Sequence, residues 1–371
     1  MSLYEKYGLK PVINAAGRMT VLGVSTPGPE VIAAVDDGLA HYFDIGDLVD
    51  KTGAYIAGLV GAEAAVVVSC ASAGLAQAVA ALIVRDDGWL RDNLHAAPLR
   101  VPHHIVLPKG HNVHYGAPIA TMVRLGGGRV VEAGYANECT PAQLAAALDD
   151  RCAAVLYVKS HHCVQKSHLS VAQAAEVAHQ HDLPLIVDAA AEEDLRAYLQ
   201  AGADLVIYSG AKAIAGPTSG LVLGKAQYIA WLKQQSSGIG RAMKVGKESI
   251  LGLTQAIEHY LTQPGISGAQ MVEKMTPFIA SLNALSGISA RVVWDTAGRD
   301  IARAEIHVDE TLAGLTAGDL VQALKTGPVA IYFRGYKANE GIIEADVRSV
   351  SAAQLVTIAD AIRTRLEEKT A

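Results

Sequence analysis

The feature that most constrains the fold is a pair of apolar stretches that each lead to a chemically active side chain. Residues 183–187 are apolar and stop at Asp188, and residues 204–208 form a second largely apolar stretch that is followed shortly by Lys212. Residues 192–201, between the two, have helical composition. A strand, a helix and a second strand make one crossover unit, in which the strands are parallel. We therefore expect Asp188 and Lys212 at the same edge of an open sheet.

An acid and an amine at that edge suit the chemistry of pyridoxal 5'-phosphate (PLP). Ligands of open α/β sheets bind where the strands end. Lys212 could form a Schiff base with the cofactor, while the Asp188 carboxylate could pair with the pyridinium nitrogen and keep it protonated. Taken alone, the pair has an equally good alternative interpretation. In it, Asp188 is a helix N-cap and Lys212 is a solvated loop lysine.

Two stretches of small residues could hold the phosphate of such a cofactor. One surrounds the lysine and contains Ser209, Gly216 and Thr218, whose hydroxyls and backbone amides could bind phosphate oxygens. In the other, a strand-like run over residues 64–70 leads through Ser72, Ala73 and Gly74 into a helical pattern. The free amides and the positive end of that helix dipole would favour a dianion. The alternative for the second stretch is close packing of a helix on a sheet.

Four stretches in chain order resemble a known family. Residues 10–15, 61–64, 209–212 and 240–247 are similar to PLP-dependent enzymes of the aspartate-aminotransferase fold, in the branch of bacterial selenocysteine synthase. Within that branch, residues 13–20, 159–162 and 188–193 most resemble the D-glucosaminate-6-phosphate ammonia-lyases. Selenocysteine synthases usually read Asp-Leu-Gly-Ser-Gly at residues 188–192 and carry an additional N-terminal domain for tRNA. These two departures argue against a tRNA substrate.

The resemblance implies both a fold and a reaction. The fold would be α/β, fold type I, with a mostly parallel central sheet and a smaller C-terminal α+β domain. The reaction would convert D-glucosaminate 6-phosphate to 2-keto-3-deoxygluconate 6-phosphate and ammonia, with Lys212 as Schiff base and as base for the α-proton. The alternatives are another PLP-dependent lyase, an aldolase or a selenocysteine-synthase-like transferase, and a non-catalytic PLP-fold binding or regulatory protein. The presence of both Asp188 and Lys212 weighs against the non-catalytic alternative.

Further side chains receive roles from their types and from the resemblance. His111 lies where related enzymes place a flat side chain over the pyridine ring, and His162 and Tyr115 are candidates for proton transfer or contact with substrate hydroxyls. The histidines follow no zinc-binding spacing, so we expect no metal site. The expected catalytic residues are Lys212, Asp188, His162 and Tyr115, and the expected cofactor-binding residues are Ser72, Ala73, Gly74, His111, Asp188, Ser209, Lys212, Gly216 and Thr218.

Cations for the acidic groups of a substrate cluster in one glycine-bearing loop. Arg241, Lys244 and Lys247 suit a carboxylate or a sugar phosphate, although a solvated basic loop is the alternative. Arg18 and Arg334 are further candidates. The resemblance places the site at a subunit interface, so we expect a homodimer or a larger homo-oligomer in which some of these cations act in the partner's site.

Turn residues and apolar runs divide the chain into three expected parts. Residues 1–45 would wrap around the core, residues 46–262 would form a large PLP-binding α/β domain, and residues 263–371 would form the small domain. Beyond the strands already named, we expect strands near residues 100–107, 129–132, 153–158, 291–294, 303–308 and 329–333.

Composition fits a compact metabolic enzyme. The 371 residues have a formal net charge of −6, so the chain lacks the excess of lysine and arginine typical of proteins that bind nucleic acids or membrane surfaces. The first residues lack the apolar core of a signal peptide, and no apolar run is long enough to span a bilayer. Four irregularly spaced cysteines indicate reduced thiols. We therefore expect a cytoplasmic enzyme that binds neither nucleic acid nor membrane.

Overall fold

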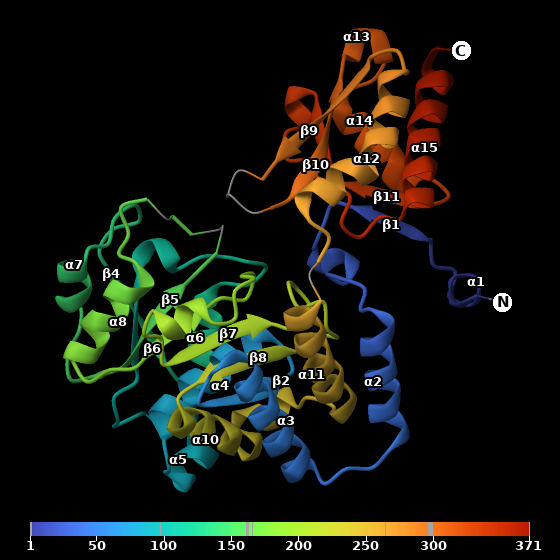
Figure 1. Cartoon of the computed structure of the whole chain (residues 1–371). Coiled ribbons are helices and arrows are strands. Elements are labelled where there is room, and N and C mark those ends of the chain that lie inside the picture. The colour runs from blue at the N-terminus through green and yellow to red at the C-terminus, as the bar shows by residue number, and fades with distance from the viewer. Residues whose placement is uncertain are drawn as a thin grey trace. The chain divides into compact units, whose positions relative to one another are not determined.

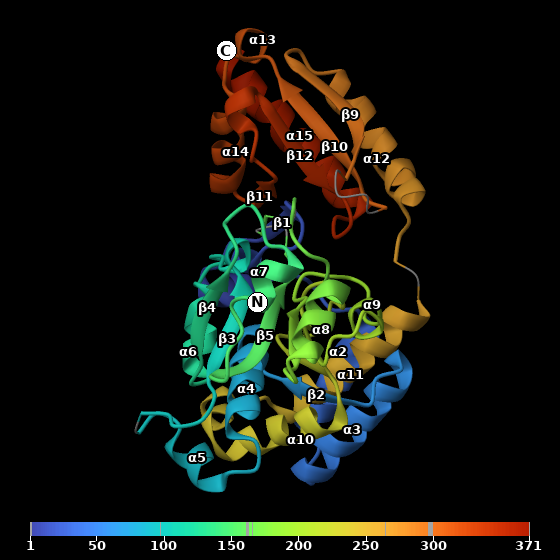
Figure 2. The same cartoon turned by 90° about the vertical axis from the view of Figure 1, so that its left-hand side faces the viewer.

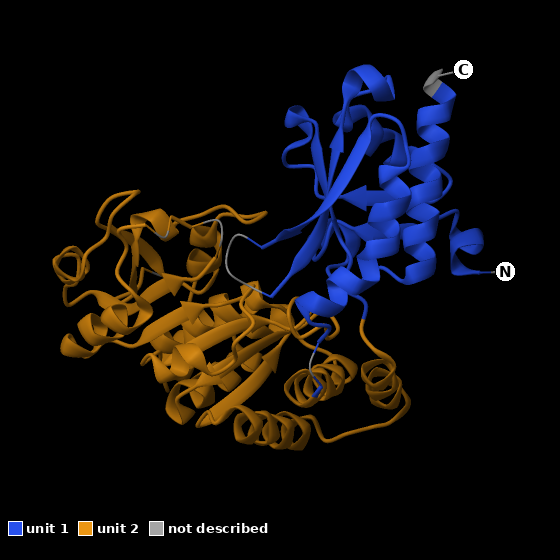
Figure 3. Cartoon of the chain, turned by 45° about the horizontal axis from the view of Figure 1, so that its top comes forward, with its two compact units in different colours: residues 1–26, 263–371 blue, residues 27–262 orange. Residues whose placement is uncertain are grey.

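The chain divides into two compact units. The computed structural model describes residues 2–96, 98–160, 163–164, 166–263, 265–295 and 300–370. Unit 1 contains residues 1–26 and 263–371, and unit 2 contains residues 27–262 (Figure 3). The division after residue 262 lies where the sequence suggested one. The N-terminal segment differs from the expected wrapping segment, because its first part belongs to unit 1 and its remainder to unit 2.

Unit 2 is built on a mostly parallel sheet. In its described part the sheet has seven strands in the order β2-β8-β7-β6-β5-β3-β4, and only β8 runs antiparallel to its neighbours (Figure 1). The α/β fold with a mostly parallel central sheet is therefore confirmed. The strands are β2 (Ala64–Val68), β3 (His104–Pro108), β4 (Arg129–Ala133), β5 (Cys152–Val158), β6 (Leu185–Asp188), β7 (Leu205–Ser209) and β8 (Gly220–Gly224).

Both faces of this sheet are buried, which explains why its central strands are continuous apolar runs. Alternate side chains of each strand point to opposite faces, so that Val187 belongs to one core cluster and Ile186 to the other. The first cluster also includes residues of α3, α8 and α11, and the second includes residues of α4, α6 and α10. The helical segments of unit 2 are α2 (Pro29–Ala40), α3 (Ile45–Val60), α4 (Ala71–Val84), α5 (Gly88–Asn93), η2 (Lys109–His111), α6 (Ile119–Leu125), α7 (Pro141–Ala145), α8 (Val171–Gln180), α9 (Ala197–Gln200), α10 (Ala226–Gln234), η3 (Gln235–Ser237), η4 (Ile239–Met243) and α11 (Lys247–Thr262).

The connection between β6 and β7 is less helical than the sequence suggested. We expected a helix over residues 192–201, but only α9 (Ala197–Gln200) forms. The Asp194 side chain accepts hydrogen bonds from the amides of Arg196 and Ala197, and the Tyr208 hydroxyl donates to the Asp194 carbonyl. These bonds hold the segment before α9 in turns. The two strands are nevertheless parallel neighbours, as expected.

Unit 1 joins the beginning of the chain to its end. Strand β1 (Val12–Ala15) pairs in parallel with β11 (Ala330–Phe333), and β12-β10-β9 form an antiparallel sheet that is packed against helices α12 and α15 (Figures 1 and 2). Neither β1 nor β12 was predicted from the sequence. The remaining elements are α1 (Leu3–Tyr7), η1 (Thr20–Leu22), α12 (Gly268–Asn283), β9 (Ile288–Trp294), β10 (Ala302–Val308), α13 (Glu310–Ala313), α14 (Ala317–Thr326), η5 (Ala338–Glu340), β12 (Ile342–Asp346) and α15 (Ala352–Thr370).

Membrane-spanning helices are not found among the described residues, since none of those helices is both long enough and apolar enough to cross a bilayer.

A buried carboxylate, that of Asp204, ties three strands of unit 2 together at the edge opposite Asp188. Its Oδ2 atom accepts a hydrogen bond of 2.7 Å from the amide of Leu185, the first residue of β6, and contacts His179 Nε2 at 2.8 Å. Its Oδ1 atom pairs at 2.6 Å with Lys225, which directly follows β8. The side chain is only 1% exposed. Asp204 itself directly precedes β7, so one carboxylate fixes the ends of β6, β7 and β8.

We predict that Asp204→Ala destabilises unit 2. The buried Leu185 amide and the side chains of His179 and Lys225 lose their acceptor, which should lower the free energy of unfolding by about 3 kcal/mol. Lys225→Ala is the matched control, and it should cost less than about 1 kcal/mol because Lys225 is half exposed. Urea titration of both variants measures the difference. Equal stability of the two variants would contradict the anchoring role.

Candidate active site

Asp188 and Lys212 come together at one edge of the unit 2 sheet. Asp188 is the last residue of β6, and Lys212 lies three residues after Ser209, the last residue of β7. The two strands are adjacent and parallel, so both residues lie at the carboxyl edge. The charge of each side chain affects the pKa of the other. The geometry therefore agrees with the expected pairing of an acid and an amine.

Burial shifts the pKa values of this pair in opposite directions. Burial raises the pKa of the Asp188 carboxyl, while the hydrogen bond of 3.1 Å from the Ala190 amide and the positive charge of Lys212 act against that rise. Burial lowers the pKa of the Lys212 amine, and the charge of Asp188 opposes that change. A lysine with a lowered pKa is more often neutral and is a better nucleophile and base. A buried carboxylate, in turn, is stabilised by a cationic partner such as a pyridinium nitrogen.

The loop that carries Lys212 is closed by its own backbone. The Gly210 amide donates to the Ser219 carbonyl at 2.9 Å, and the Gly216 amide donates to the Gly210 carbonyl at 2.8 Å. A Cβ atom at Gly210 would lie 2.2 Å from Ser219 Oγ, so this approach requires glycine. The Gly216 amide is thus already bonded within the loop and is not free for a phosphate, contrary to our expectation. Thr218 is exposed and Ser209 is half-buried.

The N-terminus of α4 offers a site for an anion. Cys70 is the N-cap residue, and its Sγ atom accepts from the Ala73 amide at 3.3 Å, while its carbonyl accepts from the Gly74 amide at 2.9 Å. The amides of Ala71 and Ser72 precede these bonds and have no partner within the helix. Gly220, the first residue of β8, allows the helix to start here, because a Cβ atom would lie 2.5 Å from the Cys70 carbonyl carbon.

The three residues expected to bind the phosphate at the start of α4 are Ser72, Ala73 and Gly74. They differ in the groups that they can offer to it. The Ser72 amide has no partner within the helix, and the Ser72 hydroxyl is hydrogen-bonded to the Tyr115 hydroxyl. Gly74 instead allows close packing of α4 on the sheet, since a Cβ atom there would lie within 3.3 Å of Val68, Ile207 and Val222. Gly74 therefore serves the close packing of helix on sheet, which was the alternative interpretation of this stretch. The Ala73 amide is already bonded to Cys70 Sγ.

Tyr115 contacts Ser72 at the start of α4 and is affected by the charge of Asp188. Its hydroxyl lies 3.1 Å from the Ser72 hydroxyl, and burial raises the pKa of the phenol, with a smaller contribution from the charge of Asp188. The side chain is therefore close to Ser72, where a phosphate would bind, and within electrostatic range of the residue expected at the pyridine nitrogen. His162, the other expected proton-transfer residue, lies outside the described residues.

His111 differs from its expected role over the cofactor ring. The imidazole is fully buried, stacked on His168 with ring centroids 5.2 Å apart and placed edge-on to Tyr157. Its Nδ1 atom accepts from the Val158 amide at 3.3 Å, and burial lowers the pKa of the ring to about 3. A neutral ring that is enclosed by protein has no exposed face for a cofactor. Its contact with β5 indicates a role in packing.

The candidate cations fall into three groups. Lys247 is used within the fold, because its ammonium donates to the Leu39 and His41 carbonyls. Arg241 and Lys244 are exposed and line a cavity of about 500 Å³ in unit 2, next to β2 and α3. In unit 1, Arg18 is exposed, and Arg334 follows β11 and pairs through Nε with Glu344 at 3.1 Å.

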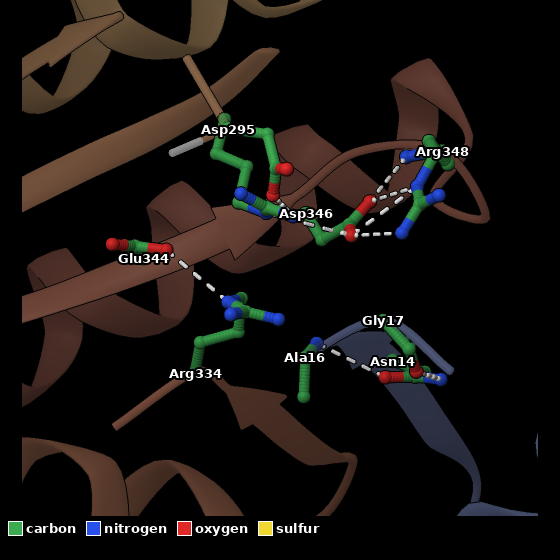
Figure 4. A network of polar contacts seen from close by, with 9 residues as sticks. Asn14, Ala16, Gly17, Asp295, Arg334, Glu344, Asp346 and Arg348 are labelled. Carbon is green, nitrogen blue, oxygen red and sulfur yellow. Dashed lines mark hydrogen bonds and ion pairs between the residues drawn. The ribbon is translucent and has the colours of Figure 1, made fainter. Parts of the chain in front are cut away.

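A buried charge network in unit 1 was not expected from the sequence (Figure 4). Asp346, at the end of β12, pairs with Arg348 at 2.7 Å and lies 3.8 Å from Arg303 Nε. Gly17 passes directly over this carboxylate with φ of +88°, and a Cβ atom there would lie 2.9 Å from Asp346 Oδ2. Charged residues inside predicted strands, such as Arg303, were the sequence feature that could have indicated this network. The network supports the turn that precedes Arg18.

Comparison with known proteins agrees with this geometry. The family model of SelA, L-seryl-tRNA selenium transferase, matches residues 44–361. D-glucosaminate-6-phosphate ammonia lyase of Salmonella typhimurium is 45% identical over 98% of this chain and 97% of that protein. A solved structure of a D-glucosaminate-6-phosphate ammonia-lyase has a TM-score of 0.95 at 43% identity, with full coverage of both chains.

The chain is also similar to two further proteins, one in sequence and one in fold alone. A 5'-C-glycyluridine monooxygenase-decarboxylase from Streptomyces is 40% identical over 94% of this chain and 88% of that protein. A structure of SPT with PLP shares the fold alone, with a TM-score of 0.55 at 15% identity over 97% of this chain and 89% of that chain. The fold is that of the PLP-dependent fold type I enzymes, and the chain belongs to the SelA family.

Proposed function

We propose that this protein is a PLP-dependent ammonia-lyase that converts D-glucosaminate 6-phosphate to 2-keto-3-deoxygluconate 6-phosphate and ammonia. The observation that carries the proposal is the pairing of Asp188 with Lys212 at the carboxyl edge of β6 and β7. The substrate is that named for the relative with 45% identity over nearly the whole chain. The reaction is balanced, because the water lost in elimination is taken up again when ammonia is released.

The residues around the pair fit the cofactor. Lys212 would hold it covalently, Asp188 would pair with its ring nitrogen, and the Ser72 hydroxyl with the free amides at the start of α4 would bind its phosphate. Tyr115 lies close enough to Ser72 to complete the phosphate site. PLP, when bound, supplies an electron sink for the carbanion at the α-carbon of the substrate.

The side chains of this protein then have to move protons and exclude competing reactions. Lys212, whose pKa is lowered by burial, can take the α-proton. Its ammonium, or the Tyr115 hydroxyl, can deliver a proton to the departing C3 hydroxyl, which is otherwise a poor leaving group. The raised pKa of Tyr115 keeps the phenol protonated and able to donate.

The acidic ends of the substrate require cations. Arg241 and Lys244 border a cavity and are exposed, and Arg18 is exposed in unit 1. We assign the substrate's carboxylate and phosphate to this set together with Arg334. Lys247 is better explained as a structural residue because its ammonium is already bound to two carbonyls. We further place the enzyme in the cytoplasm as a homodimer or larger homo-oligomer, with its site at the subunit interface.

Incubation with D-glucosaminate 6-phosphate tests the proposed function directly. The wild-type protein should release equal amounts of ammonia and 2-keto acid without consuming oxygen, and Lys212→Ala should reduce turnover by at least about a thousandfold because both the attachment point and the base are lost. Oxygen consumption with carbon dioxide release would instead favour the chemistry named for the Streptomyces relative. Absence of turnover in a PLP-loaded wild-type protein would overturn the substrate assignment.

The pKa of Lys212 gives a second prediction. In the cofactor-free protein, burial lowers this pKa below 10.5 and the negative charge of Asp188 raises it again. Asp188→Asn removes that charge but keeps an oxygen for the Ala190 amide, so the pKa should fall further. The pH midpoint for the reaction of added PLP with Lys212, followed by visible absorbance, should therefore shift to lower pH. A shift to higher pH would show that Asp188 does not act on this amine.

A further inference from the structure

A second cavity, within unit 1, has the features of an anion site. Its volume is about 210 Å³, and its walls include Arg303, Arg334 and Lys337 together with Trp294 and Tyr336. Asp295 and Glu344 also line it, so the lining carries three positive and two negative side chains. The cavity lies beside the charge network of Figure 4, in which Arg334 and Glu344 face one another.

Two of the three cations, Arg334 and Lys337, have donor groups that lack an acceptor within the part of unit 1 that the structure describes. Arg334 engages Glu344 through Nε alone, so its two terminal nitrogens are available. The Lys337 side chain is exposed and has no hydrogen bond or ion pair with a described residue. Arg303 is 4% exposed and is already paired, because its guanidinium contacts Asp295 at 2.9 Å and its Nε atom lies 3.8 Å from Asp346 Oδ2; it adds positive charge to the wall of the cavity.

The geometry of the donors favours a tetrahedral anion over a planar one. A carboxylate has two oxygens and is matched by one arginine fork, whereas a phosphate monoester has three terminal oxygens and two charges. Here three separate side chains border one cavity. Tyr336 packs on the guanidinium of Arg334, with the ring centroid 5.4 Å away, and so helps to hold it in place.

We propose that this cavity binds the phosphate group of a phosphorylated small molecule through Arg303, Arg334 and Lys337. The flanking aromatic rings of Trp294 and Tyr336 suit the carbon chain next to the phosphate. The ligand is the phosphate end of the substrate or a separate phosphate monoester. The binding proposal does not depend on the ammonia-lyase reaction, because it can be measured without turnover.

The test uses Trp294 as the reporter in the PLP-loaded protein. Inorganic phosphate, D-glucosaminate 6-phosphate and D-glucosaminate are titrated separately at constant ionic strength, and Trp294→Phe identifies the signal from this tryptophan. We expect a saturable change with the two phosphate-bearing ligands and none with D-glucosaminate. A saturable response to D-glucosaminate at similar concentrations would identify a carboxylate site and overturn the proposal, and so would the absence of any saturable response.

Lys337→Ala is the decisive variant, because the side chain has no partner among the described residues and its removal should leave the fold intact. Phosphate binding should weaken about tenfold, the loss expected for one charge-assisted contact. Lys6→Ala, which removes an exposed lysine of α1 that does not line the cavity, is the matched control and should bind as the wild type does. Equal affinity of Lys337→Ala and wild type would contradict the assignment.

Steady-state kinetics of the same variant distinguish the two sources of phosphate. If the phosphate belongs to the substrate, Lys337→Ala should raise KM for D-glucosaminate 6-phosphate and leave kcat largely unchanged. If phosphate binding weakens while KM stays the same, the cavity takes a separate phosphate monoester. Failure of the ammonia-lyase assay alone would leave the fluorescence result standing, so the two proposals fail separately.

Discussion

The parallel pairing of β6 with β7 is the constraint on which the rest of the site depends. Two adjacent parallel strands end at the same edge of a sheet, so Asp188 and the loop of Lys212 must lie side by side. Asp204 fixes the opposite ends of the same strands and thereby their register. The position of the acid relative to the amine thus follows from backbone hydrogen bonds and one buried carboxylate.

The environment of the pair explains its chemistry. Burial acts on the carboxyl and the amine in opposite directions, since it disfavours the charged form of each, and the mutual attraction of the two charges opposes both shifts. The site is thereby suited to a ligand that brings a cationic ring nitrogen to Asp188 and an aldehyde to Lys212. The start of α4, where Gly220 permits close approach, supplies amides for the phosphate of the same ligand.

Local patterns in the sequence predicted six of the seven strands of the described sheet, all but β8, and the positions of Asp188 and Lys212 at the ends of two of them, because these features depend on residues that are close in the chain. Contacts between distant residues were not predictable in this way. Strand β1 was missed because it pairs with β11, more than 300 positions later, and the burial of His111 depends on His168 and Tyr157. Lys247 was predicted from the sequence to bind the substrate, but the fold brings the end of α2 to its ammonium.

Reduction of the PLP-loaded protein with borohydride, followed by peptide mass spectrometry, tests the central claim most directly. Reduction makes the link between PLP and its lysine permanent, so the modified residue can be identified. The account predicts one phosphopyridoxyl group per chain, located on Lys212 and lost in Lys212→Ala. Modification of another lysine, or none in protein that has been supplied with PLP, would contradict the claim that the pairing of β6 with β7 builds the cofactor site.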